Sequence, residues 1–118
     1  MQTLAVDVPY PPSVNHYWRR VGPRTLISRA GRVFRDQVCA ILAARHVRPL
    51  DGPLAMVVEI FPPDHRRRDV DNCLKSLLDA LEKAGAYHDD SQIASLTIRK
   101  CAVTPGGRAT VQIQTVEC

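Results

Sequence analysis

The sequence predicts an α/β protein of the α+β type, in which two helices pack against a mixed sheet. Three observations predict this class: apolar runs with strand spacing, two segments with helical apolar spacing, and proline or glycine clusters between them. The predicted order of elements is β-α-β-α-β-β. With 118 residues, 45% of them hydrophobic, the chain is expected to form one domain spanning residues 1–118.

The N-terminal segment is the first predicted strand, because Leu4, Val6 and Val8 alternate with other side chains. Three prolines within residues 9–12 end this strand, since proline lacks the N–H group that a sheet requires. A polar, arginine-rich loop is expected to continue to about Ser28.

The first predicted helix begins after Ser28, a plausible N-cap, and continues to about His46. Its apolar side chains fall on one helical face. They are Phe34, Val38, Ile41 and Leu42.

A second strand is predicted at 54–61, where both faces are apolar except at Glu59, so it should lie in the centre of the sheet. The second predicted helix carries leucines with helical spacing, and Gly85 stands where a helix-terminating glycine belongs. These leucines are Leu74, Leu77, Leu78 and Leu81. Two final strands, at about 95–103 and 109–116, flank a Thr-Pro-Gly-Gly turn and suggest a hairpin.

The distribution of charge suggests a polyanionic partner. Residues 1–48 contain eight arginines and two aspartates, whereas the remaining 70 residues contain eight basic and ten acidic groups. Thirteen of the sixteen basic residues are arginine, whose planar guanidinium binds phosphate through two parallel hydrogen bonds. An arginine-rich proteome explains this composition equally well.

Other features exclude several classes of protein. No stretch of about 18 apolar residues predicts a membrane span, and no secretory signal is recognisable, so a cytoplasmic location is expected. The four cysteines do not have the spacing of a metal site and are expected to be reduced. They are Cys39, Cys73, Cys101 and Cys118.

Aspartates cluster around the second predicted helix, because six of the nine lie between positions 64 and 90. Asp69 and Asp71 are expected at its start, and Asp90 follows its end. On a helical wheel, four polar residues lie within about 80° of one another, opposite the leucines. These are Asp71, Lys75, Asp79 and Glu82. The simplest interpretation is a solvated helix face with Asp71 as N-cap and an ion pair between Asp71 and Lys75.

The residues around Asp69 and Asp71 favour metal-assisted phosphate chemistry instead. Two aspartates two residues apart repel each other, and a divalent cation bound between them relieves the repulsion. Mg²⁺ prefers one or two carboxylates with water and phosphate oxygens. The adjacent residues 66–68 are all arginine and can bind the phosphate. Phosphodiester cleavage needs this combination of cation and neighbouring positive charge.

Five segments resemble one known family over almost the full length of the chain. They are residues 11–17 (Pro-Pro-Ser-Val-Asn-His-Tyr), 66–75 (Arg-Arg-Arg-Asp-Val-Asp-Asn-Cys-Leu-Lys), 79–81, 89–90 and 106–108. The sequence resembles the RusA family of Holliday junction resolvases, small nucleases common in phages and prophages that act in DNA recombination and repair.

The resemblance implies a homodimer that uses Mg²⁺ or Mn²⁺ and makes paired nicks across a four-way DNA junction. It also implies that Asp69, Asp71 and Asp90 bind the metal and that Lys75 assists catalysis. The alternative is a DNA-binding protein without catalysis, such as a phage regulator, whose carboxylates are only caps and surface charge.

We expect five arginines to contact backbone phosphates. Asn15 is a secondary candidate, which either orients the substrate or holds a turn. The arginines are Arg19, Arg20, Arg66, Arg67 and Arg68. The neighbouring Tyr17 and Trp18 either stack on bases or belong to the core.

The spacing also predicts a fold-back. A helix ending at Ala84 would separate Asp71 from the helix end by about 21 Å, and the five steps from Gly85 to Asp90 span about 17 Å. The chain must therefore double back to bring Asp90 to Asp71, unless Asp90 completes the site of a second protomer. The dimer interface is expected at either the last hairpin or the first helix.

Overall fold

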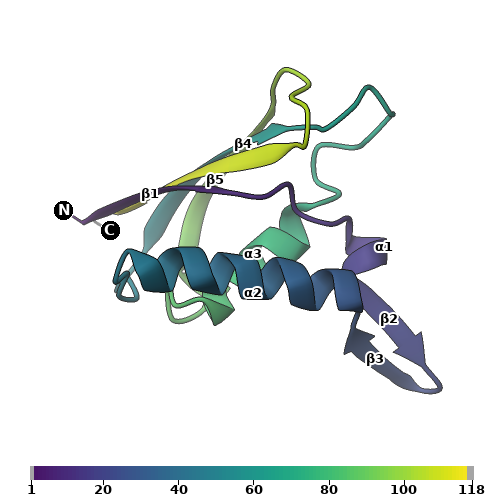
Figure 1. Cartoon of the computed structure of the whole chain (residues 1–118). Coiled ribbons are helices and arrows are strands. Elements are labelled where there is room, and N and C mark those ends of the chain that lie inside the picture. Colours follow the sequence, from purple (N-terminus) through teal and green to yellow (C-terminus); the bar gives the residue numbers. More distant parts are fainter. Residues whose placement is uncertain (1, 117–118) are drawn as a thin grey trace.

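The computed structural model describes residues 2–116, which contain a mixed sheet, three α-helices, a 3₁₀ helix and a small hairpin (Figure 1). The strands are β1 (Thr3–Val8), β2 (Trp18–Val21), β3 (Arg24–Ile27), β4 (Leu54–Phe61), β5 (Ile93–Lys100) and β6 (Arg108–Thr115). The helices are α1 (Val14–Tyr17), α2 (Arg29–Ala44), α3 (Leu74–Lys83) and the 3₁₀ helix η1 (Asp90–Gln92).

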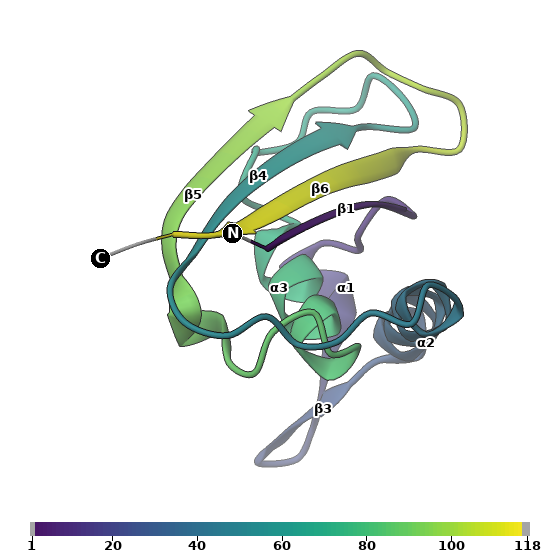
Figure 2. The same cartoon turned by 90° about the vertical axis from the view of Figure 1, so that its left-hand side faces the viewer.

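The main sheet has the strand order β1-β6-β4-β5, and its helices lie on one side (Figure 2). Strand β4 pairs antiparallel with β6 and parallel with β5, while β1 pairs antiparallel with β6. Alternate residues of β4 are fully buried against the helices, namely Leu54, Met56, Val58 and Ile60. The α+β class and the central position of this strand are therefore confirmed.

Both predicted helices are confirmed, with small changes at their ends. The Ser28 hydroxyl accepts a hydrogen bond from the Gly31 N–H at the start of α2, as an N-cap does. Helix α3 is followed by Gly85 at φ +87°, the left-handed conformation expected of a terminating glycine. Helix α3 begins at Leu74, so Asp71 lies in the preceding turn and does not cap the helix.

The predicted hairpin of the last two strands is wrong, because β4 lies between β5 and β6. The connection 101–107 crosses the end of β4 instead, and the Thr104 N–H donates to the carbonyl of Pro62. Strand β4 pairs along most of its length with β6 at one edge and with β5 at the other, which leaves no direct pairing between β5 and β6. The suggestion that a terminal hairpin forms the dimer interface therefore has no structural basis.

The predicted loop before Ser28 is also wrong, because it contains α1 and the β2–β3 hairpin. This hairpin turns at Gly22, which has φ +58°, and projects away from the body of the molecule (Figure 1). Its strands are four residues long and largely exposed, so they lack the apolar alternation that reveals a strand.

No helix in residues 2–116 is long and apolar enough to cross a membrane. Three cysteines within this part of the chain are free thiols, as expected. Cys118 lies outside the described residues.

A polar contact joins the three helices. The Asp79 carboxylate of α3 accepts a hydrogen bond from the buried Tyr17 hydroxyl of α1. It also accepts one from the Arg35 guanidinium of α2, with 3.1 Å between nitrogen and oxygen. Burial and the bond to Asp79 raise the pKa of Tyr17 to about 12, so this hydroxyl remains a donor at neutral pH. The Arg35 Nε atom is buried without a partner among the described residues, which offsets part of the stability that this ion pair contributes.

Replacing Tyr17 by Phe removes one donor to the Asp79 carboxylate without opening a cavity. We expect a loss of about 1–3 kcal/mol in the free energy of unfolding, the usual contribution of a hydrogen bond to a charged group. Urea denaturation followed by circular dichroism measures it. Tyr10→Phe is the matched control, since no hydrogen bond is recorded for its hydroxyl in the described structure, and it should change stability by less than about 0.5 kcal/mol. Equal stability of the two variants would contradict a structural role for this contact.

Candidate active site

Carboxylates flank α3 at both ends. Asp69 and Asp71 precede the helix, whereas Asp89 and Asp90 follow it. The two ends differ in how their carboxylates are held.

The C-terminal group consists of Glu82, Asp89 and Asp90, each of which has one carboxylate oxygen within 4.8 Å of the others. The Asp90 N–H donates to the Glu82 carboxylate at 2.8 Å, and the Ser91 N–H donates to the Asp89 carboxylate at 2.8 Å. This backbone hydrogen bond from Ser91 lowers the pKa of Asp89. The group therefore offers several carboxylate oxygens close together, which suits a hard divalent cation.

This group forms because the chain doubles back after α3, as the fold-back prediction required. The Ala86 N–H returns to the Leu81 carbonyl, and the Tyr87 hydroxyl donates to the Leu78 carbonyl at 2.7 Å. Burial, with Asp90 and other carboxylates nearby, raises the pKa of Tyr87. Gln92 closes the turn by donating to the Leu50 carbonyl at 2.9 Å. The fold-back nevertheless brings Asp90 to Glu82 and not to Asp71.

The N-terminal pair, Asp69 and Asp71, is exposed in the turn that leads into α3. Their backbone carbonyls accept hydrogen bonds from the N–H groups of Asn72 and Leu74, at 3.1 Å each, which shapes the turn. Lys75 is exposed in the first turn of α3, and the described residues show no ion pair between it and Asp71.

The two carboxylate groups lie at opposite ends of β5. Lys100, the last residue of β5, donates from Nζ to the carbonyl of Arg68, directly before Asp69, at 3.0 Å. Asp90 lies three residues before the first residue of the same strand, Ile93. The eight residues of β5 extend about 23 Å along the strand. One chain therefore keeps Asp69 far from Asp90, although a shared metal site would need both within a few ångströms.

The three arginines before Asp69 have different environments. Arg68 forms an ion pair with Asp64 at 2.8 Å, and its guanidinium lies 5.7 Å from the centre of the Tyr10 ring. A hydrogen bond from Arg68 lowers the pKa of Asp64. The Arg66 guanidinium makes only a long contact of 3.7 Å with the same carboxylate, and Arg67 is exposed. Arg66 and Arg67 are thus available to phosphate, whereas Arg68 holds the loop.

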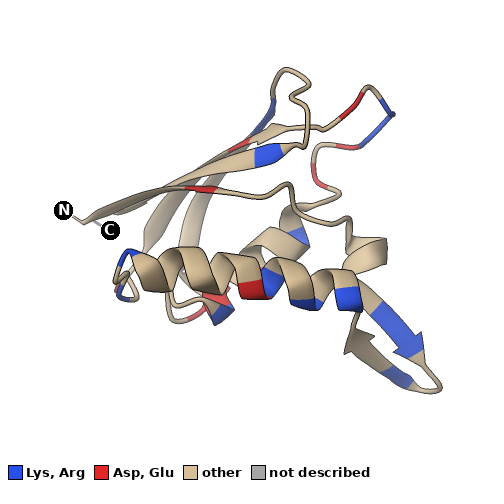
Figure 3. Ribbon diagram, viewed as in Figure 1, with Lys and Arg blue, Asp and Glu red and all other residues tan. Residues whose placement is uncertain are grey.

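The predicted DNA-contacting residues of the N-terminal third are mostly exposed. Arg19 and Arg20 lie on the projecting hairpin, where basic residues continue to the start of α2 (Figure 3). Asn15 is exposed on α1. Tyr17 is fully buried, and Trp18 packs edge-on against it with 4.9 Å between ring centres, so Tyr17 belongs to the core.

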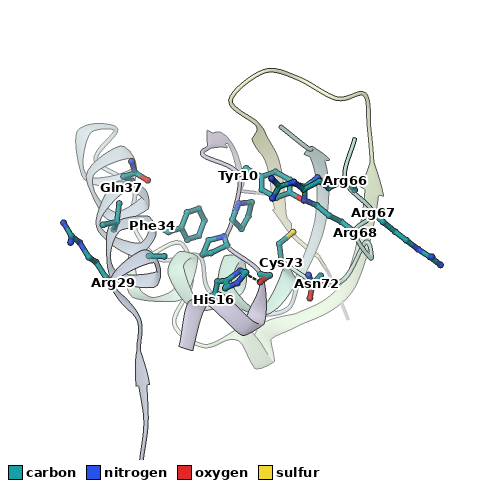
Figure 4. A pocket seen from close by; sticks show the side chains of 15 residues that line it. Tyr10, His16, Arg29, Phe34, Gln37, Arg66, Arg67, Arg68, Asn72 and Cys73 are labelled. Carbon is teal, nitrogen blue, oxygen red and sulfur yellow. Dashed lines mark hydrogen bonds between the residues drawn. The ribbon is translucent and has the colours of Figure 1, made fainter. Parts of the chain in front are cut away.

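A groove lies beside the N-terminal pair, between α2 and the loop that contains Arg66, Arg67 and Arg68 (Figure 4). It includes the residues that follow Asp71, namely Asn72 and Cys73, and the proline segment after β1. From α2 it includes Arg29, Val33 and Gln37. Sequence reasoning did not find this groove, because its walls come from segments that are distant in the sequence. It also did not group Glu82 with Asp90, although the helical wheel placed Glu82 on the polar face.

Comparison with known proteins identifies the family. The model described as endodeoxyribonuclease RusA matches residues 9–114. The crossover junction endodeoxyribonuclease RusA of Escherichia coli strain K12 is 40% identical over 114 residues, which cover 96% of this chain and 95% of the relative. The protein of that name from Enterobacteria phage 82 has the same identity and coverage, and that from Escherichia coli O139:H28 is 37% identical. The match extends over nearly the full length of both chains, and the chain therefore belongs to the RusA family of endodeoxyribonucleases.

Proposed function

We propose that this protein is a metal-dependent endonuclease that resolves four-way DNA junctions by paired nicks in the cytoplasm. The observation that carries the proposal is the adjacency of Asp69 and Asp71 to the exposed guanidinium groups of Arg66 and Arg67, beside a groove. Carboxylates that can hold a cation thus stand next to groups that can hold a phosphate. The names of its relatives, crossover junction endodeoxyribonucleases, support the same substrate.

The donor set fits Mg²⁺ or Mn²⁺, because the candidate ligands are carboxylate oxygens and hard cations prefer oxygen. Such a cation activates water and stabilises charge on the cleaved phosphate. The protein's own residues position the substrate: Asp69, Asp71 and Asp90 would hold the cation, and Arg66 and Arg67 the phosphate. Lys75, exposed one turn after Asp71, would donate a hydrogen bond to a phosphate oxygen.

We further propose that each active site is built from two protomers. Because α3 and β5 separate Asp69 and Asp71 from Asp90 within one chain, a site containing all three needs the Asp90 group of a second chain. A homodimer with two-fold symmetry would then form two equivalent sites, one for each strand that is cut. Glu82 would support Asp90 in this site through its hydrogen bond to the Asp90 N–H.

Substituting Asp69, Asp71 or Asp90 by Asn should abolish cleavage and preserve junction binding. The amide keeps the shape of the side chain but loses the charge that attracts the cation, so the rate should fall on the order of 10²-fold or more. The measurement is a gel with a labelled four-way junction, with Mg²⁺ or with chelator, beside a mobility-shift assay. Asp36→Asn, an exposed aspartate of α2, is the control and should cut normally. If the wild-type protein does not cut with Mg²⁺ or with Mn²⁺, the nuclease proposal is wrong and the alternative, a DNA-binding protein without catalysis, remains.

Arg67→Gln should weaken binding to all junction sequences equally, because a phosphate contact carries no sequence information. It should reduce the slope of log K against log salt concentration by about one unit. Arg48→Gln, exposed outside the groove, should leave the slope unchanged. Arg68→Gln should instead loosen the loop by freeing Asp64, which limited proteolysis at residues 62–69 measures. An unchanged slope for Arg67→Gln would rule out its phosphate contact.

A further inference from the structure

The groove beside Asp71 has the size and surface of a ligand site. Its volume is about 750 Å³, within the range of about 300–1,000 Å³ that small-molecule pockets occupy. Its surface is mostly apolar and includes Pro11 and Pro12 from the segment after β1 and Val33 and Phe34 from α2. Val33 is 49% exposed, so its side chain is accessible to a ligand in the groove.

The rim of this groove is positively charged. Four of its lining residues are arginines, and none is acidic. The side chains of Arg29 and Arg67 extend outward from opposite sides (Figure 4). An apolar surface flanked by arginines on two sides complements a nucleotide. The flat base can be buried against the apolar surface, and the negatively charged phosphates on either side can bind the arginines.

Two amide side chains add hydrogen-bonding capacity. Gln37 comes from α2 and Asn72 from the turn into α3, on opposite sides of the groove (Figure 4). Each offers both a donor and an acceptor, as the edge of a base requires. Asn72 also directly follows Asp71, so a nucleotide in the groove would lie next to the cation that the N-terminal carboxylates would hold.

We propose that the groove takes up one unstacked nucleotide of the DNA strand that is cut, with its base on Val33 and its flanking phosphates on Arg29 and Arg67. The proposal rests on the proposed function and identifies where a branched substrate differs from a duplex. Unstacking costs a few kcal/mol in a duplex and less at a branch point, so a groove that needs an unstacked base favours branched DNA. Gln37 and Asn72 then select which base is accepted.

The test uses four-way junctions that carry the fluorescent adenine analogue 2-aminopurine at successive positions near the branch point, bound in chelator so that no cutting occurs. Wild-type protein should raise the fluorescence strongly at one position, since the analogue brightens when it leaves the stack. Val33→Trp fills the groove and should abolish that rise. Ala40→Trp is the matched control, because Ala40 is exposed on the same face of α2, about 10 Å further along the helix and outside the groove. It should keep the rise.

A rescue experiment separates loss of the groove from general damage. Val33→Trp should cut the normal junction on the order of 10²-fold more slowly with Mg²⁺, because the scissile phosphate is misplaced. An abasic nucleotide at the responsive position should restore its rate, since no base then needs the groove. If Val33→Trp does not fold, Val33→Glu with Ala40→Glu as control replaces the pair, because the new charge repels the nucleotide.

Three results would overturn the proposal: an unchanged fluorescence rise in Val33→Trp, no rescue by the abasic substrate, or a monomer mass for Val33→Trp beside a dimeric Ala40→Trp. The last result would assign the groove to a second copy of the chain. Wild-type cutting, measured in parallel with Mg²⁺, distinguishes these failures from a failure of the nuclease function itself.

Discussion

The carboxylate of Asp79 accepts hydrogen bonds from Tyr17 and Arg35 and so connects α3 to α1 and α2. Together with the buried Leu77 and Leu81, this contact fixes the position of α3, and two functional features depend on that helix. The helix holds the N-terminal carboxylates at one end and the Asp90 group at the other, and the turn before it forms one side of the groove. Gly31 allows the close approach of α1 to α2, because a Cβ atom there would lie 2.5 Å from the Tyr17 carbonyl oxygen.

Elements with a strong local signal could be predicted from the sequence, and elements defined by tertiary pairing could not. The leucine spacing of α3 and the apolar run of β4 can be recognised in the sequence, because the buried face of each element requires apolar side chains at regular intervals. The connection 101–107 has a turn sequence that fits a hairpin equally well, and only the pairing of β4 at both edges decides against it. The β2–β3 hairpin has little buried surface and so leaves no apolar pattern to detect.

The same distinction applies to the site. The motif around Asp69 and Asp71 indicates phosphate chemistry because its residues are adjacent in the sequence. A helical wheel places Asp79 with Asp71 on one polar face, but its partners lie 62 and 44 residues away and make it a structural residue. Arg68 likewise differs from Arg66 and Arg67 through its close ion pair with Asp64 and its contact with the Tyr10 ring. From the sequence alone, all three arginines are expected to bind phosphate. In the fold, Arg68 stabilises its loop, and only Arg66 and Arg67 stay available to the substrate.

The central claim is that carboxylates at the two ends of α3 act together only across a dimer. Mixing two inactive proteins, Asp71→Asn and Asp90→Asn, tests it most directly, with subunit exchange verified by mass. If sites are shared, each mixed dimer contains one site with both substitutions and one intact site. Cutting should then return as single nicks at about a quarter of the wild-type number of sites. If every site is built within one chain, each site in the mixed dimer carries one substitution, and continued absence of cutting would contradict the claim.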